Sequence, residues 1–192
     1  MEYILFAVLG LALAASCGFR VFIPMLVVSI ASFSGHIELA SDFQWIATKA
    51  ALIVFAIATV LEVAAYYVPW LDNILDVLST PVAIIAGIIV AASFISGMHP
   101  LLKWVLAIVA GGGAAGLVQG ATAGLRVTSS ASTAGVGNPI VATLENIAAT
   151  VISVLSVLLP VLGIIVAGII VIMILIMLRK LRNRRRDAKA HH

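Results

Sequence analysis

The chain has 192 residues, of which 63% are hydrophobic and 10% charged, and its mean hydropathy is +1.23. Soluble domains are about 45–50% apolar and about 25% charged, so this composition excludes a soluble globular protein and makes lipid the solvent for most of the chain. The formal net charge of +3 is unevenly distributed, because residues 1–178 carry four Lys/Arg against seven Asp/Glu, whereas residues 179–192 carry seven against one. The basic charge therefore belongs to a C-terminal tail, and nucleic-acid binding is excluded as well.

Six stretches are long and apolar enough for membrane-spanning helices, which need about 20 mostly apolar residues. They are residues 2–19, 45–68, 77–97, 101–125, 138–158 and 161–178. The segment 21–34 is apolar but only about 14 residues long, and it contains Pro24. It predicts a half-helix or re-entrant segment, or alternatively a tilted seventh span. We therefore expect an all-α polytopic membrane bundle in which residues 1–178 form one transmembrane domain.

Charged and aromatic residues orient the predicted bundle. Lys and Arg next to membrane helices stay on the cytoplasmic side, so the run RKLRNRRR at 179–186 predicts a cytoplasmic C-terminus in a bacterial inner membrane. Six spans would put the N-terminus in the cytoplasm too, and seven would put it outside. The last two residues of the tail, 191–192, resemble a purification-tag remnant. The aromatic residues expected at the membrane interface are Tyr66, Tyr67, Trp70, Trp45 and Trp104.

An internal repeat is the most informative pattern. Residues 10–20, GLALAASCGFR, align without a gap to residues 116–126, GLVQGATAGLR, and both copies end in Gly-x-Arg. The match predicts two related units, 1–76 and 101–178. If 21–34 does not cross the membrane, the two Gly-x-Arg helices run in opposite directions, as in inverted-repeat transporters. A complete crossing would make them parallel.

The second copy also carries small residues at four-residue spacing, which places them on one face of a helix. They are Gly112, Gly116, Gly120 and Gly124. Small residues let another backbone approach closely, so we expect this face to pack within the chain or against a second copy in a homo-oligomer. The alternative is chance, because glycine is common in membrane helices.

Four ionisable residues fall within or at the end of the predicted spans: Arg20, Glu62, Arg126 and Glu145. An unpaired charge inside a membrane costs several kcal/mol, so such groups usually face the protein interior, a partner or water. The simplest construction lets each repeat unit give one Arg and one Glu to a shared interior. These charges then either form structural ion pairs or exchange a proton or cation during transport.

Three further polar residues are candidates for lining a pathway. Asp72 and Asp76 lie four residues apart at the mouth of the third span, where they either gather a cation or favour the start of a helix. Asn138 belongs to the segment 127–139, which is rich in Ser, Thr and Gly. That composition predicts either a polar loop or an unwound segment lining a cavity.

Sequence motifs for catalysis are absent. The sequence has no Walker-type phosphate loop, no Cys/His metal cluster and no GxSxG elbow. We therefore expect no enzymatic activity, no cofactor and no bound metal ion.

The pattern of conspicuous residues resembles a bacterial family of small membrane proteins catalogued as domain of unknown function 4126. The residues that carry the resemblance are Gly18-Phe19-Arg20, Pro24, Glu62, Pro69, Asp72, Gly124-Leu125-Arg126, Thr133-Ala134-Gly135, Asn138-Pro139 and Glu145. The resemblance covers nearly the whole chain and implies a fold and a set of site residues. It brings no established activity.

Together these features predict a small secondary transporter or channel for an ion or small polar solute. Arg20 and Arg126 would hold anionic groups or pair the carboxylates, and Glu62 and Glu145 would couple to protons or cations. One alternative is a structural or accessory membrane protein whose ion pairs fix the bundle and whose tail contacts anionic lipid. Another is a lipid-handling protein with a membrane-facing groove. The sequence does not name the solute or the coupling ion.

Overall fold

The computed structural model describes the backbone of residues 2–133 and 135–190, and the side chains of residues 5–68, 75, 78–133, 135–170, 172–174, 176, 179 and 180. The described chain is all helical. Its elements are α1 (Glu2–Cys17), α2 (Phe22–Phe33), the 3-10 helix η1 (Ser41–Ala47), α3 (Lys49–Ala65), α4 (Pro69–Ser93), α5 (Pro100–Leu106), the π-helical segment η2 (Ala107–Gly112), α6 (Gly113–Thr133), α7 (Asn138–Leu158) and α8 (Pro160–Ala190).

Prolines mark several helix starts, as expected from a residue that lacks an N–H and has a fixed φ. Pro69, Pro100 and Pro139 each lie in the first positions of a helix. Pro81 lies inside α4. Helices α5, η2 and α6 form one 34-residue helix, Pro100–Thr133.

The helices include several that suit a lipid environment. Within the described residues, Pro100–Thr133 and Asn138–Leu158 are long and apolar enough to cross a membrane, and η1 with α3 would make a third span bent by 62°. Shorter apolar helices are Leu5–Cys17, Phe22–Phe33, Leu78–Ser93 and Pro160–Ile174. These helices are compatible with a membrane protein, and the number of spans stays a prediction.

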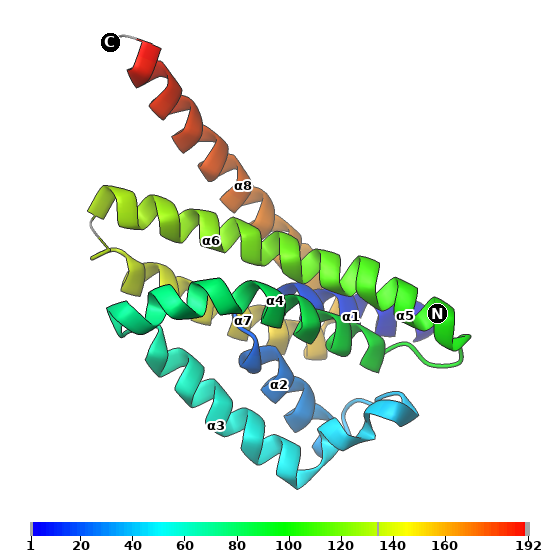
Figure 1. Ribbon diagram of the computed structural model, residues 1–192. Helices are drawn as coiled ribbons and strands as arrows, with labels where there is room; N and C mark the ends of the chain where they lie inside the picture. Colours follow the sequence, from blue (N-terminus) through cyan, green and yellow to red (C-terminus); the bar gives the residue numbers. More distant parts are fainter. Residues whose placement is uncertain (1, 134, 191–192) are drawn as a thin grey trace.

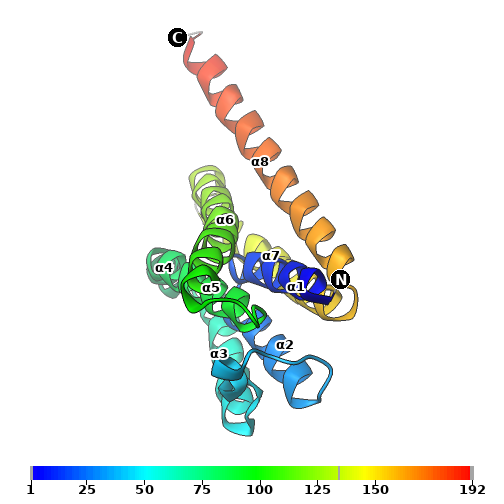
Figure 2. The ribbon, with the colours of Figure 1, turned by 90° about the vertical axis from the view of Figure 1, so that its right-hand side faces the viewer.

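The central helices run alternately in opposite directions (Figures 1 and 2). Helices α1 and α7 are antiparallel, because Ser16 hydrogen-bonds to Ser153 at 2.8 Å while Arg20, four residues later, bonds to Asn146. Helices α4, α6 and α7 pack beside α1. Helices α2 and α3 cross this group obliquely, and α8 leaves it at an angle (Figure 1).

The segment 21–34 forms the short helix expected from its length. Helix α1 ends at Cys17, and α2 runs only from Phe22 to Phe33. After the break at residues 18–21, α2 turns back toward the end of the molecule where α1 begins (Figure 1). The loop after α2 is fixed at that end, where the Ala40 N–H donates to the Ser93 carbonyl at 2.8 Å. The break between α1 and α2 therefore lies inside the bundle.

The two Gly-x-Arg helices run in the same direction. Gly87 of α4 contacts both Ala14 of α1 and Gly111 of η2, whereas Gly18 lies against Ala115 and Val118. Residue numbers therefore increase in the same direction along α1 and along the helix Pro100–Thr133. The inverted relation that we considered needs opposite directions and does not describe this pair.

The second copy of the repeat does not become irregular after its arginine. Helix α6 continues through residues 127–133, and α7 begins at Asn138. In this segment Thr128, Ser132 and Thr133 donate to carbonyls one helical turn back, as Thr128 does to Gly124 at 2.9 Å. These local bonds are compatible with a helix, so the expected loop or unwound segment is wrong for residues 127–133.

Close packing of small residues joins α4 to η2 and α6. A Cβ added to Gly87 would lie 2.6 Å from Ala115 Cβ and 2.8 Å from the Gly111 carbonyl oxygen. Among the glycines expected to form a packing face, Gly112 lies against Ile88, whereas Gly120 has open space around it. The closest approach of the helices therefore falls one position away from the predicted glycine face.

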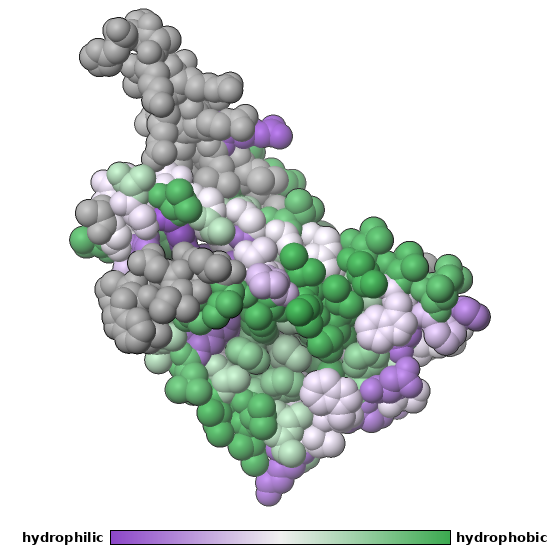
Figure 3. All heavy atoms as spheres, viewed as in Figure 1, coloured by the Kyte–Doolittle hydropathy of each residue, from purple (hydrophilic) through white to green (hydrophobic). Residues whose placement is uncertain are grey.

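Large apolar side chains cover much of the surface. Leu117, Val60 and Ile140 are 71%, 67% and 67% exposed. In Figure 3 hydrophobic residues cover a broad area over the middle of the face, and hydrophilic residues lie at the lower tip and toward the right-hand end. Exposed apolar area of this extent is unusual for a water-soluble monomer and suits a lipid environment.

Candidate functional site: a buried charge cluster at a helix break

Two buried arginines share one carboxylate. Arg20 lies in the break between α1 and α2, and its Nη1 is 2.8 Å from Glu145 Oε2. Arg126 of α6 bonds to the same oxygen through Nη2 and to Oε1 through Nε at 3.1 Å. Relative exposures are 1% for Arg20, 3% for Arg126 and 4% for Glu145. Because all three charges are removed from solvent, each depends on the others for compensation.

Arg20 makes further hydrogen bonds that fix its guanidinium group. Its Nε donates to Asn146 Oδ1 at 2.5 Å, and its Nη2 donates to the Ala142 carbonyl at 3.2 Å. Its Nη1 also donates to the Phe19 carbonyl at 3.2 Å. Arg20 therefore links the helix break to α7 through both charge and backbone contacts.

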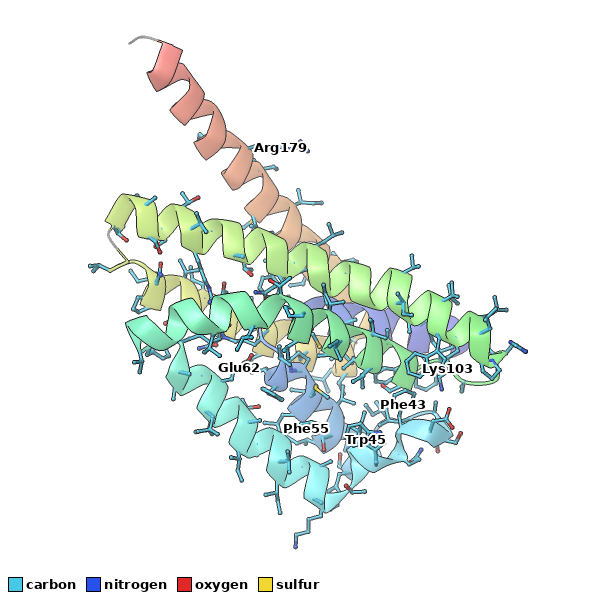
Figure 4. The ribbon with its side chains drawn as sticks, viewed as in Figure 1. Phe43, Trp45, Phe55, Glu62, Lys103 and Arg179 are labelled. Atoms are coloured by element: carbon cyan, nitrogen blue, oxygen red, sulfur yellow. The ribbon has the colours of Figure 1, made fainter. Side chains whose placement is uncertain are left out.

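Glu62 of α3 caps the second half of the broken helix pair. Its Oε1 accepts from the Val21 N–H at 2.8 Å, and its Oε2 accepts from the Phe22 N–H at 3.0 Å. The N-terminal N–H groups of a helix lack partners within the helix and favour a negative charge, so a carboxylate suits this position. Glu62 is partly exposed, in contrast to Glu145. Figure 4 shows Glu62 in the middle of the molecule, near the start of α2.

Tyr66 contacts both arginines. Its ring centroid lies 3.9 Å from Arg20 Cζ and 4.1 Å from Arg126 Cζ. Cations are attracted to the face of an aromatic ring, most strongly where water is excluded, and Tyr66 is only 4% exposed. The expectation that Tyr66 belongs to an interfacial aromatic belt is therefore wrong. Its neighbour Tyr67 is 44% exposed.

A polar chain continues from Tyr66 into α4 and α6. Ser79 hydrogen-bonds to the Tyr66 side chain and accepts from Gln119 Nε2 at 2.6 Å. On the other side, Tyr67 Oη lies 2.9 Å from Thr143 Oγ1. Residues from α3, α4, α6 and α7 thus surround the helix break with polar contacts.

The structure brings together the four charged residues expected to share an interior. We call Arg20, Glu62, Tyr66, Arg126 and Glu145 the charge cluster; its formal charges sum to zero. Tyr66 was not singled out from the sequence as a member. A Tyr about one helical turn after an intramembrane Glu is the signal that would have suggested it.

The other predicted site residues lie elsewhere. Asn138 is two helical turns before Glu145 on α7, and its Nδ2 donates to Ser130 Oγ at 3.0 Å. The side chains of Asp72 and Asp76 lie outside the described residues, although both positions belong to α4. Their predicted role in gathering a cation stays a prediction.

A cleft lies beside the charge cluster, between α6, α7 and α8. Its volume is about 670 Å³, and Glu145 forms part of its lining. Most of the lining is apolar, with hydroxyl groups of α6 toward one end. We call it the α6–α8 cleft. The volume falls within the range of sites for small organic ligands, about 300–1,000 Å³.

One more ion pair lies at the end of the bundle where α1 begins. Lys103 Nζ is 3.1 Å from Asp42 Oδ2 and 4.8 Å from the centre of the Phe43 ring. Lys103 and Phe43 are visible in Figure 4 far from Glu62. This pair ties η1 to α5 and is separate from the charge cluster. Among the described residues, no three His, Cys, Asp or Glu side chains are grouped to hold a metal ion.

Comparison with known proteins identifies the family. The family model described as "Domain of unknown function (DUF4126)" matches residues 7–180. The chain belongs to the DUF4126 family. The match confirms the resemblance seen in the sequence, and it includes every member of the charge cluster. No curated protein and no solved structure matches the chain, so the family assignment supplies no activity.

Proposed function

We propose that this DUF4126 protein is a small secondary transporter or channel for an ion or small polar solute, embedded in the bacterial inner membrane. The observation that carries the proposal is the convergence of four charged side chains at a helix break inside an apolar bundle. Intramembrane ionisable residues commonly mark solute and ion pathways. Broken helices supply backbone groups at such sites in known transporters.

The two carboxylates are suited to different roles. Glu145 is buried and bonded to both arginines, so neutralising it would remove a compensating charge from two adjacent cations. Glu62 is partly exposed, and its hydrogen bonds go to two backbone N–H groups. Its protonation would weaken these hydrogen bonds, and both arginines would keep their ion pairs with Glu145. We therefore assign proton or cation coupling to Glu62 and a positioning role to Glu145.

If Glu62 left the Val21 and Phe22 N–H groups, the helix break could bind a different anionic group. The α2 N-terminus and two arginines favour negative charge, and the Glu62 carboxylate meets that preference in the observed conformation. A solute with an anionic group would compete with Glu62 for the same N–H groups. This competition couples the protonation of Glu62 to solute binding.

Transport is tested by flux in liposomes that contain the purified protein and a pH-sensitive dye. We expect one member of a panel of small organic acids and inorganic ions to change internal pH when its gradient is imposed. Glu62→Gln should reduce this flux at least about tenfold while the melting temperature stays within a few degrees. Glu38→Gln is the matched control, because Glu38 is an exposed loop residue, and it should retain wild-type flux. Full flux in Glu62→Gln would exclude the coupling role.

A structural role is the second candidate, and the pairing of Glu145 with both arginines favours it. In that case the charge cluster only fixes the helices, and Glu62 only caps α2. Glu62→Gln should then lower the melting temperature, and no solute should change the internal pH in liposomes made with the wild type. A lipid-handling role has its own evidence in the α6–α8 cleft.

A further inference from the structure

The α6–α8 cleft changes in polarity along its length. Thr128, Ser129 and Ser132 of α6 line one end. Beyond Glu145 the lining consists of apolar residues such as Ala148 and Val151 of α7. Because α7 is antiparallel to α6, the hydroxyl groups lie toward the C-terminal end of α6 and the apolar part extends toward the middle of the bundle.

The cleft is open to the surroundings rather than enclosed. Its rim includes Leu144 and Met173, which are both 62% exposed, and Ile147, which is 55% exposed. These side chains are apolar, so the opening faces lipid if the bundle lies in a membrane. A lipid chain can therefore enter sideways, without crossing a polar surface.

Positive charge lies beyond the hydroxyl end. Helix α8 lines the cleft through Ile170, Met173 and Ile174, and Arg179 and Lys180 follow on the same helix as exposed residues. Five residues of helix span about 7.5 Å, so Arg179 lies more than one turn beyond Ile174. Figure 4 shows Arg179 on the part of α8 that has separated from α6.

We propose that the α6–α8 cleft binds one anionic phospholipid, with an acyl chain against the apolar lining and its headgroup between the α6 hydroxyls and the basic residues Arg179 and Lys180. The order of apolar lining, hydroxyls and positive charge follows the order of chain, glycerol and phosphate in a lipid of the leaflet on the tail's side. The site rests on the membrane placement proposed above and does not require transport.

The hydroxyl groups favour a headgroup that donates hydrogen bonds. Thr128 Oγ1 already donates to the Gly124 carbonyl, and Ser132 Oγ donates to the Thr128 carbonyl at 2.8 Å. A hydroxyl has one proton, so these oxygens are left to accept. Phosphatidylglycerol provides both the donors and the phosphate. It is therefore the probe that we choose.

The test uses the full-length protein in detergent, with native mass spectrometry and thermal unfolding in the presence of dioleoyl phosphatidylglycerol or dioleoyl phosphatidylcholine. A lipid that binds the folded state raises the melting temperature. We expect one phosphatidylglycerol to be retained per protein and to stabilise it at a concentration about 25-fold below that of phosphatidylcholine, because each of the two basic residues near an anionic headgroup adds on the order of a fivefold preference. Equal effects of the two lipids would overturn the proposal.

Variants separate the chain site from the headgroup site. Ala148→Phe fills the cleft and should abolish retention, whereas Ala50→Phe adds the same bulk at an exposed position of α3 and should retain the lipid. Arg179→Gln with Lys180→Gln should remove the preference for phosphatidylglycerol, and Lys49→Gln should keep it. The charge variants alter exposed side chains, so they remain informative if Ala148→Phe does not fold. An unchanged lipid preference in the double variant would contradict the assignment.

Flux and lipid binding fail independently. Loss of lipid retention in Ala148→Phe with normal flux would leave the transport proposal standing. Absence of flux in the wild type, with selective retention of phosphatidylglycerol, would leave the lipid site standing and favour the lipid-handling role.

Discussion

In the charge cluster, the contribution of each charged residue to stability depends on its partners. Glu145 forms ion pairs with both Arg20 and Arg126. Removing one partner from a buried ion pair typically destabilises a protein by about 3–5 kcal/mol, because a charge is left without compensation. The contribution of each member is therefore best measured in pairs.

We predict that Glu145→Gln lowers the free energy of unfolding by about 3–5 kcal/mol, and that adding Arg126→Gln restores part of the loss. The second change removes one of the two cations that pair with Glu145, while Arg20 keeps its bonds to Asn146 and Ala142. Thermal or denaturant unfolding in detergent gives the values. The exposed Glu38→Gln should change stability by less than about 0.5 kcal/mol. Additive losses in the double variant would show that the two residues are not coupled.

At this scale the sequence predicted the participants better than the contacts. Arg20, Arg126, Glu62 and Glu145 stood out because charges are rare in apolar segments. Their pairing was not readable, because it depends on which helix faces lie together. Both arginines meet Glu145, and Glu62 meets a helix N-terminus instead. Tyr66 was misassigned because an aromatic residue near a helix end has the same sequence signature at an interface and beside a buried cation.

Among the elements, the contact between α4 and the long helix Pro100–Thr133 depends on missing side chains. Gly87 and Gly111 let the two backbones approach where a Cβ would overlap the neighbouring helix. Gly120 on the same long helix has no neighbour within 4 Å of an added Cβ. Glycines of one helix therefore differ in what they contribute.

We predict opposite effects for two Gly→Ala substitutions. Gly87→Ala should destabilise the protein by about 1–3 kcal/mol, because its Cβ would overlap Ala115 and the Gly111 carbonyl. Gly120→Ala should be neutral or stabilise by up to about 1 kcal/mol, since alanine is the better helix former. Unfolding midpoints of the two variants in one detergent provide the comparison. A destabilising effect at Gly120 without loss of oligomerisation would be inconsistent with the open space around it.

Element positions were predictable where length and hydrophobicity determine them. The segment 138–158 coincides with α7, and the short segment 21–34 contains the short helix α2. The segment 127–133 was misread because Ser and Thr satisfy their hydroxyls on carbonyls of the preceding turn and so remain in α6. The packing face lies one position from the predicted glycine face because Gly111 and Ala115, rather than Gly112 and Gly116, meet Gly87 of α4, and four-residue spacing alone does not tell which face of a helix meets its neighbour.

For the whole molecule, the directions of the helices determine at which end of the bundle each terminus lies. Helices α1, α6 and α8 run the same way, and α4 and α7 run the opposite way (Figure 1). The start of α1 and the end of α8 therefore lie at opposite ends of the bundle. In a membrane this arrangement favours an odd number of crossings, as in the seven-span alternative with an external N-terminus.

We predict that reporters fused to the two termini report opposite sides of the membrane. A C-terminal fluorescent reporter that folds only in the cytoplasm should be active, because we expect the basic tail at 179–186 to lie on the cytoplasmic side. A periplasm-dependent phosphatase should be active at the N-terminus. Activity of the cytoplasm-dependent reporter at both termini would support the six-span topology instead.

The π-helical segment η2 has a consequence for the spacing of charges along the longest helix. Lys103 and Arg126 are both buried, yet an uninterrupted α-helix, turning about 100° per residue, would point them about 140° apart. A π turn holds one extra residue, which rotates the following part by about 100° and brings the two cations within about 40° of each other. Deleting one residue from 107–112 would restore the α-helical phase and turn either Lys103 or Arg126 outward. The extra residue therefore allows one continuous helix to contribute a buried cation to two separate ion pairs.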